Sequence, residues 1–191
     1  ALGIGSMEEP GFLREAGIEL PMYFDQGMYS WNHLAGAAME RYGADRLTIP
    51  VELNEREIRD SGVQGEMIVY GYLPMMISAQ CIRKTTLGCS GKSEIMWLKD
   101  RKDMRFPVVN QCRFCYNTIY NSAPLSLLGL SEQVTGLKPN AVRLNFTVEE
   151  PAAAGEILDA FFEEYGMSEK AAEPPVLRNQ FTRGHFKRGV E

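Results

Sequence analysis

Four cysteines are the residues of this chain best suited to chemistry. They are its only cysteines, Cys81, Cys89, Cys112 and Cys115, and their spacing is C-x7-C-x22-C-x2-C. Four thiolates complete a tetrahedral metal site, and a C-x2-C pair lets two sulfurs face one metal from a single turn. Zinc sites favour two tight pairs, whereas clusters tolerate wider gaps, so the spacing favours an iron–sulfur cluster, with zinc as the alternative. Free buried thiols or an opportunistic disulfide also fit the spacing.

Two carboxylates are candidate catalytic residues. Asp25 follows the apolar run Leu20–Phe24, and Glu52 follows the run Arg46–Val51. Both runs are typical of strands, and α/β enzymes place catalytic groups at the carboxyl ends of parallel strands. Glu66 precedes a third such run. The alternative is that these carboxylates only cap turns and face the solvent.

A third candidate site is the basic string near the end of the chain. It reads Arg183-Gly-His185-Phe-Lys187-Arg188-Gly, with Arg178 a few residues earlier. Backbone amides at the glycines and several cations could bind an anionic substrate. The alternative is a frayed basic tail. His33, within an expected helix, is interpreted as a surface or packing residue.

Several common catalytic motifs are missing from the sequence. It contains no P-loop, no G-x-G-x-x-G, no nucleophile elbow and no H-E-x-x-H. Nucleotide hydrolysis, Rossmann-type redox chemistry and zincin proteolysis therefore lack support from motifs.

The elements expected to position these residues begin as strands separated by helices. Strands are expected over 20–25, 46–51 and 66–70. A helix beginning near Ser30 should end at Gly43, and a second should cover 55–60 behind a capping box formed by Asn54 and Glu57. Strands that alternate with helices predict a parallel sheet with its site at the carboxyl ends of the strands.

The remainder of the chain divides into two further segments. Residues 73–140 contain all four cysteines, with prolines and glycines, and are expected to be irregular loops and short strands. Residues 141–191 should form a strand over 141–148, a helix that begins at Pro151 and ends at Gly166, and the basic tail. With the βα units of 1–72, we expect these segments to form one compact domain.

The composition is that of an ordinary globular protein, but the charged residues are unevenly distributed along the chain. The chain has 191 residues and a net charge of -5. Between residues 81 and 120, however, eight basic residues face three acidic ones. This segment and the tail could attract an anionic partner such as RNA, or the charges could simply be solvated. The most apolar stretch, 67–79, is too short to span a bilayer, and no signal peptide is recognisable, so we expect a cytoplasmic protein without membrane contact.

Several blocks of the sequence resemble a known family. These blocks are Ile49–Asn54, Glu66–Cys81, Leu98–Arg101, Phe106–Val108, Cys112–Cys115, Ile119–Ser122 and Phe181–His185. In order and spacing they resemble the collagenase-like peptidases, family thirty-two of the peptidases of unassigned mechanism. The resemblance covers nearly the whole chain and corresponds to the C-terminal half of the family's catalytic region.

The resemblance implies a fold, a cofactor and a reaction. It implies an α/β fold with a partial (β/α) barrel whose upstream half is supplied by preceding sequence. Cys81, Cys112 and Cys115 match family cysteines. Where many relatives have a further cysteine, this chain reads Leu73-Pro-Met-Met76, so Cys89 would be the fourth ligand. Related branches resemble oxygen-independent hydroxylases of RNA bases or of quinone precursors, and we favour their four-iron four-sulfur cluster.

Two functions from different classes are therefore expected. The first is an iron–sulfur enzyme of the hydroxylating kind that acts on an anionic substrate. The second is a peptidase or peptide-binding module whose cysteines hold a structural metal or remain free thiols.

Overall fold

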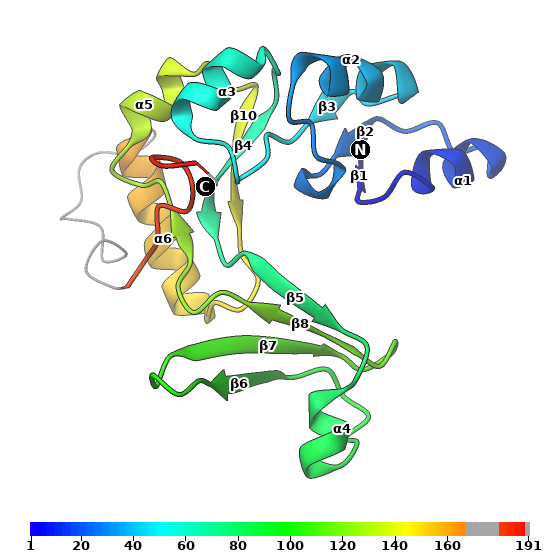
Figure 1. The fold of residues 1–191 in the computed structure, drawn as a ribbon, viewed down its shortest axis with the longest axis vertical. Helices are drawn as coiled ribbons and strands as arrows, with labels where there is room; N and C mark the ends of the chain where they lie inside the picture. Colours follow the sequence, from blue (N-terminus) through cyan, green and yellow to red (C-terminus); the bar gives the residue numbers. More distant parts are fainter. Residues whose placement is uncertain (167–179, 190–191) are drawn as a thin grey trace. The chain divides into compact units, whose positions relative to one another are not determined.

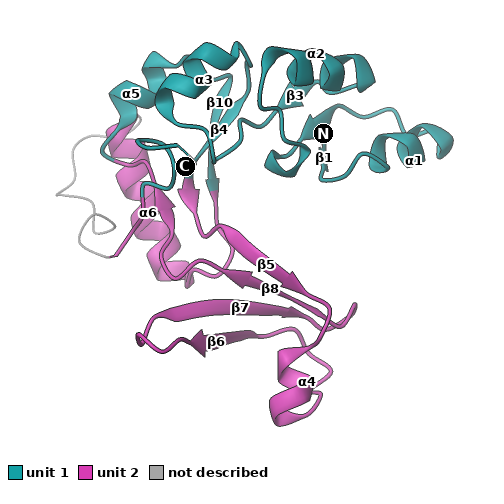
Figure 2. Cartoon of the chain, in the orientation of Figure 1, with its two compact units in different colours: residues 1–69, 129–144, 183–191 teal, residues 70–128, 145–182 magenta. Residues whose placement is uncertain are grey.

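The chain folds as a mixed α/β protein. The structure, a computed structural model, describes residues 1–166 and 180–189. Within these residues it has six α-helices and three sheets, and none of the sheets closes into a barrel (Figure 1). The chain forms two compact units, the first comprising 1–69, 129–144 and 183–191 and the second 70–128 and 145–182 (Figure 2). The segments expected from the sequence were consecutive, whereas these units are interleaved; a single compact domain stays a prediction.

Unit 1 opens with parallel strands separated by helices, as expected from the sequence. Its first sheet has the order β1-β2-β3, and both strand pairs are parallel. The elements are β1 (Leu2–Ile4), α1 (Glu9–Glu15), β2 (Met22–Phe24), the 3-10 helix η1 (Gln26–Met28), α2 (His33–Tyr42) and β3 (Arg46–Leu47). α2 begins after Asn32, which caps Ala35 N–H, rather than at Ser30, and it ends at Gly43 in the left-handed conformation, as expected.

The parallel succession continues into β4 (Glu66–Gly71). Thr48 forms a parallel bridge with Glu66, and Ile49 N–H donates to the Glu66 carbonyl at 2.8 Å. α3 (Glu55–Ser61) lies between, and the expected capping box of Asn54 and Glu57 is present in both directions. A second sheet has the order β10-β4-β9, with β9 at Leu125–Ser126 and β10 at Ala141–Asn145. α5 (Ser131–Gly136) lies between these strands in the sequence.

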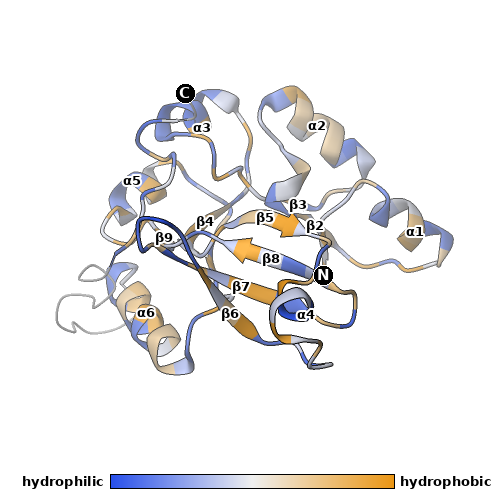
Figure 3. Ribbon diagram, turned by 60° about the horizontal axis from the view of Figure 1, so that its bottom comes forward, coloured by the Kyte–Doolittle hydropathy of each residue, from blue (hydrophilic) through white to orange (hydrophobic). Residues whose placement is uncertain are grey.

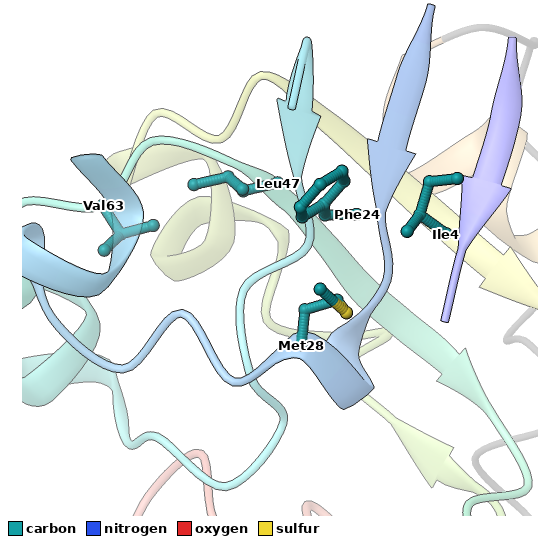
Figure 4. Packing of buried hydrophobic residues seen from close by; sticks show 5 residues of the cluster. All are labelled: Ile4, Phe24, Met28, Leu47 and Val63. Atoms are coloured by element: carbon teal, nitrogen blue, oxygen red, sulfur yellow. The ribbon is translucent and has the colours of Figure 1, made fainter. Parts of the chain in front are cut away.

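One hydrophobic cluster of unit 1 packs against its parallel sheet. Ile4, Phe24 and Leu47 project from the three strands and pack with Met28 and Val63 (Figure 4). Full burial of such side chains stabilises the folded state by roughly 1.5–3 kcal/mol each. Phe24 is completely buried directly before Asp25. The core therefore fixes the strand that ends at this predicted catalytic carboxylate.

Unit 2 contains a four-stranded antiparallel sheet with the order β5-β8-β7-β6. Its elements are β5 (Pro74–Ser78), α4 (Ile82–Leu87), β6 (Ile95–Lys99), β7 (Arg105–Gln111) and β8 (Tyr116–Tyr120). Apolar stretches lie along these strands (Figure 3). The sequence predicted irregular loops and short strands over residues 73–140. Short strands are present, but they join in one regular antiparallel sheet, which was not predicted. The connections between the strands, one of which contains α4, carry the cysteines.

The prolines of this segment are placed where a sheet tolerates them. Pro107 lies opposite Trp97 of β6, but β8 pairs with β7 only from Val108 onward, so β7 has a single partner strand at Pro107. Pro74 begins β5 at an irregularity in its register with β8. Proline lacks the N–H that a doubly paired strand needs, so it is confined to such positions. Here the prolines do not interrupt the sheet.

A single long helix completes unit 2. α6 (Pro151–Glu164) begins at the expected proline and buries Ile157, Ala160 and Phe161. Gly166 follows it with a φ of 70°, a conformation that favours glycine. Among the described helices, none has the length and apolar character needed to cross a membrane.

Candidate metal centre

The four cysteines lie on loops at one end of the antiparallel sheet. Cys81 follows β5, Cys89 precedes β6, and Cys112 and Cys115 lie in the turn from β7 to β8. Because the strands are antiparallel, the end of β5, this turn and the start of β6 meet at the same end of the sheet (Figure 1). The fold thus brings together cysteines that are well separated in the sequence.

The turn between β7 and β8 carries two of the thiols. It is closed by the pairing of Gln111 with Tyr116, and Cys115 N–H donates to the Cys112 carbonyl at 3.4 Å. Cys115 has a φ of 56°, in the left-handed region that few residues other than glycine adopt. The Cys115 thiol lies 3.8 Å from the Cys112 carbonyl oxygen. This tight turn holds the C-x2-C pair of the sequence.

Cys81 caps the short helix α4. Its Sγ accepts a hydrogen bond from Lys84 N–H at 3.4 Å. The preceding backbone is held by Asn117, a completely buried residue of β8, whose Nδ2 donates to the Gln80 carbonyl at 2.6 Å. Movement of this carbonyl would cost the buried amide one of its hydrogen bonds. Asn117 therefore fixes the position of Cys81 relative to the start of β8, close to Cys115.

The loop that contains Cys89 is held by a second buried asparagine. Asn110 of β7 is 1% exposed, and its Oδ1 accepts from Glu94 N–H at 2.5 Å. Glu94 in turn binds Arg83 of α4 at 2.7 Å and the Ser90 hydroxyl at 2.9 Å. The Ser93 hydroxyl accepts from Cys112 N–H at 3.2 Å. These bonds join the loop after Cys89 to α4 and to the turn that carries Cys112.

The thiols lie within electrostatic reach of one another. Burial raises the pKa of the Cys112 thiol above its usual value, and the thiols of Cys89, Cys115 and Cys81 raise it further. A like charge nearby disfavours ionisation. A bound metal has the opposite effect, because it stabilises thiolates.

The donor set fits a metal centre in its chemistry, although the thiols do not yet form one. All four cysteines are free, with Cys81 and Cys112 half-buried and Cys89 and Cys115 exposed. No three His, Cys, Asp or Glu side chains in the described ranges 1–166 and 180–189 form a group that could hold a metal ion as they stand. The thiols of Cys81 and Cys115 instead contact backbone groups. Closure onto a metal would require these two side chains to turn.

Asp25 lies in an ion cluster of unit 1. It follows β2, caps η1 through Gln26 N–H, and contacts Arg143 of β10 at 2.7 Å. The same guanidinium lies 2.9 Å from Glu66 and 3.2 Å from the Thr48 hydroxyl. Two of the three carboxylates singled out in the sequence thus share one arginine.

Glu52 lies in the turn that follows the Thr48–Glu66 bridge. It is half-buried. It does not belong to the ion cluster of Asp25, Glu66 and Arg143. The catalytic roles assigned to Asp25 and Glu52 stay predictions.

The basic string at the end of the chain is folded against α3. Phe186 is 4% exposed, and its carbonyl accepts from Glu55 N–H at 2.8 Å. His185 Nδ1 lies 2.8 Å from the Gly189 carbonyl oxygen. A frayed tail is therefore wrong for residues 183–189. Arg178 lies outside the described residues.

A cavity of ≈ 600 Å³ lies beside this docked string. Lys187 lines it together with Arg56 and Arg59 of α3. Arg56 is paired with Asp60 and Arg59 with Glu55, so part of their charge is neutralised. Lys187 and Arg188 are exposed, whereas Arg183 is half-buried. Substrate binding by Arg183, His185, Lys187 and Arg188 stays a prediction.

Comparisons of the chain with known protein families, with curated proteins and with solved structures found no match.

Three residues important to these sites were not expected from the sequence. Asn110 and Asn117 position the cysteine loops, and Arg143 joins two carboxylates. Asparagine is depleted in strands, so its presence within the apolar runs around Asn110 and Asn117 could have indicated a buried hydrogen-bonding role. Arg143 gave no such signal, because it lies 118 residues from Asp25.

Proposed function

We propose that this chain is part of an iron–sulfur enzyme whose cluster is held by Cys81, Cys89, Cys112 and Cys115. The observation that carries the proposal is the convergence of four separate cysteines at one end of a single sheet. Thiols that serve only for packing do not require such an arrangement. A four-iron four-sulfur cluster requires four thiolates, which is the number of cysteines in the chain.

The surroundings of the thiols support a negatively charged centre. Lys84 N–H already donates to the Cys81 sulfur, and hydrogen bonds to sulfur tune a cluster's potential. Lys84 and Arg113 place cations close to the cysteines in the sequence, and their charge would offset that of the thiolates. The buried amides of Asn110 and Asn117 act as the supporting shell that fixes the ligand loops.

The reaction that we propose is an oxygen-independent hydroxylation of an anionic substrate, an RNA base or a quinone precursor. With water as the oxygen source, R–H and H2O give R–OH, two protons and two electrons, and a separate electron acceptor must take up these electrons. When bound, the cluster would supply one-electron chemistry. The residues of the chain would bind and orient the substrate. The cations of the basic string and of the segment 81–120 are suited to an anionic substrate.

We also propose that the parallel strands belong to a (β/α) barrel. β1, β2 and β3 are successive parallel neighbours, and the Thr48–Glu66 bridge continues the series into β4. A complete barrel needs eight such strands and about 250 residues. The remaining strands would come from the upstream half of the barrel.

Redox spectroscopy tests the proposed cofactor. The chain should be reconstituted anaerobically with iron and sulfide, and then titrated with dithionite. A cluster predicts visible absorption that bleaches on reduction, with an electron paramagnetic resonance signal in one of its states. Colourless protein that binds zinc, or that binds no metal, would support the alternative in which the cysteines hold a structural metal or remain free thiols.

The reaction requires a separate test in cells that produce this protein. RNA nucleosides and quinone precursors should be compared by mass spectrometry between the parent and Cys112→Ser. The proposal predicts loss of one hydroxylated species in the variant. Unchanged RNA and quinone profiles, with a peptidase activity that survives Cys112→Ser, would favour the peptidase alternative.

A further inference from the structure

Unit 2 contains a cavity whose walls combine aromatic rings and carboxylates. Its volume is ≈ 260 Å³. Three rings line it, and three carboxylates lie among them: Tyr70, Tyr72, Trp97, Glu149, Glu150 and Glu156. The described lining contains no Lys, Arg or His. The cavity is therefore strongly acidic, although it lies in the unit that carries the basic segment.

One aromatic ring of the cavity, that of Tyr70, is packed in place before any ligand binds. Tyr70 is 3% exposed, and its ring lies 5.7 Å from that of Phe146. Trp97 of β6 is 55% exposed and completes the wall from the antiparallel sheet. Burial and then Glu149 raise the pKa values of Tyr70 and Tyr72, so both hydroxyls stay neutral at physiological pH. Neutral ring faces carry the partial negative charge that attracts cations.

Glu149 holds a carboxylate oxygen ready for a ligand. Its Oε2 accepts from the N–H groups of Thr147 and Val148, at 2.6 and 3.0 Å. Its Oε1 is buried and has no hydrogen-bond partner in the part of the chain that the structure describes. Tyr70 lies close to this carboxylate, but its hydroxyl does not form a well-aligned hydrogen bond with Oε1. A buried unsatisfied oxygen is costly, and a bound donor or cation would remove this cost.

We infer that this cavity binds an organic cation, an alkylammonium group carried by a small molecule. Aromatic faces beside the buried Glu149 oxygen are an environment in which such groups bind well, because the cation is too weakly hydrated to prefer water. Glu150 and Glu156 add negative charge from exposed positions. The volume suits a compact head group. An anionic substrate is excluded by the three carboxylates, so this site is distinct from the function proposed above.

Choline and its uncharged isostere 3,3-dimethylbutan-1-ol test the inference. The two probes have nearly the same shape and differ in charge. The chain has two tryptophans, so Trp31→Phe leaves Trp97 as the reporter. We expect choline to change the Trp97 emission saturably, and the isostere to bind at least about tenfold more weakly. Equal binding of the two probes, or no saturable change with choline, would overturn the inference.

Variants identify the charge that matters. Glu149→Gln should weaken choline binding at least about tenfold, because one carboxylate charge is lost. Asp159→Asn removes an exposed carboxylate of α6 outside the cavity and should leave affinity unchanged. If Glu149→Gln fails to fold by circular dichroism, Glu156→Gln, at an exposed position of α6, takes its place. The folded cavity variant, Glu149→Gln or its replacement Glu156→Gln, should bind choline more weakly than the control Asp159→Asn. Equal choline affinities would refute the assignment.

Discussion

At the scale of single residues, two asparagines hold the loops of the candidate centre. Asn110 and Asn117 are buried in β7 and β8, and each binds backbone of a loop that carries a cysteine. Both are polar side chains at buried positions, where an apolar residue is the more usual choice. These two buried positions therefore serve to bind the backbone of the loops instead of adding apolar packing.

Replacement of Asn117 should loosen the loop that contains Cys81. Asn117→Ala removes the buried amide donor of the Gln80 and Ser78 carbonyls, and should lower the free energy of unfolding by about 1–3 kcal/mol. Urea denaturation measures this loss, and reaction of the thiols with a disulfide reagent should become faster. Asn140→Ala, at an exposed position, should change stability by less than about 0.5 kcal/mol. Equal stability of the two variants would contradict the role of Asn117.

The sequence was informative about residues whose partners lie nearby in the chain. The capping box of Asn54 and Glu57 was predicted because its two members are three residues apart. Asp25 was correctly placed behind a strand, but its ion pair with Arg143 could not be predicted, because strand order determines that contact. The grouping of the four cysteines was predicted from composition and spacing, whereas their present contacts with backbone groups were not.

At the scale of elements, the antiparallel sheet of unit 2 was predicted only in part: short strands were expected, but not their regular pairing. Met75, Met76 and Ile77 are consecutive apolar residues of β5, and all three are more than half exposed. A strand of this kind lacks the alternation that identifies a half-buried strand. Prolines at its start and within β7 strengthened the impression of loops. The βα units were recognised because caps and turns mark their ends locally.

The docking of the terminal string on α3 depends on one glycine. Gly189 has a φ of +74°, and an added Cβ would lie 2.7 Å from Asn54 Nδ2. Gly17 has a similar φ, +66°, but open space around it. Gly17→Ala should cost about 1 kcal/mol from the backbone alone. Gly189→Ala should cost roughly 1–2 kcal/mol more, because the contact adds to the strain. Thermal unfolding compares the two, and equal losses would show that the contact is unimportant.

The end of α6 predicts a dependence of stability on alkaline pH. Burial, followed by Glu164, raises the pKa of Tyr165 to about 12 from its usual value of 10.0. The stability that the neutral Tyr165 hydroxyl contributes is fully present below its pKa in the unfolded chain. It is lost as pH rises through its pKa in the folded protein, because the hydroxyl of the unfolded chain ionises first. Between these two values, Tyr165→Phe should therefore lose less stability than the parent. Urea denaturation at several pH values measures this difference. An equal fall in the free energy of unfolding of the two proteins over this pH range would contradict the prediction.

At the scale of the whole molecule, the distribution of charge favours anionic partners at the cavity beside the terminal string and disfavours them at the acidic cavity of unit 2. The net charge is -5, yet Lys187 and the arginines of α3 line one cavity of unit 1. In unit 2, the pairs Arg83–Glu94 and Lys99–Asp103 neutralise part of the basic segment. The charge counted along the sequence was therefore an upper limit on the charge available to a partner.

The exposed end of the terminal string should bind polyanions. RNA should bind at low salt and lose affinity as salt rises, because phosphate contacts release counterions. Lys187→Gln should reduce the slope of log affinity against log salt by about 1. Lys138→Gln removes an exposed lysine that does not line this cavity, and should leave the slope unchanged. Equal slopes for the two variants, or no binding at low salt, would exclude this surface.

The central claim is that four thiols hold one iron–sulfur cluster. Its most direct test is the iron and acid-labile sulfide content of anaerobically reconstituted protein, compared with the four single Cys→Ser variants. The parent should contain about four irons and four sulfides per chain. Each variant, Cys112→Ser above all, should contain substantially less of both. A parent without sulfide, or a Cys112→Ser variant with the parent's full content, would contradict the account.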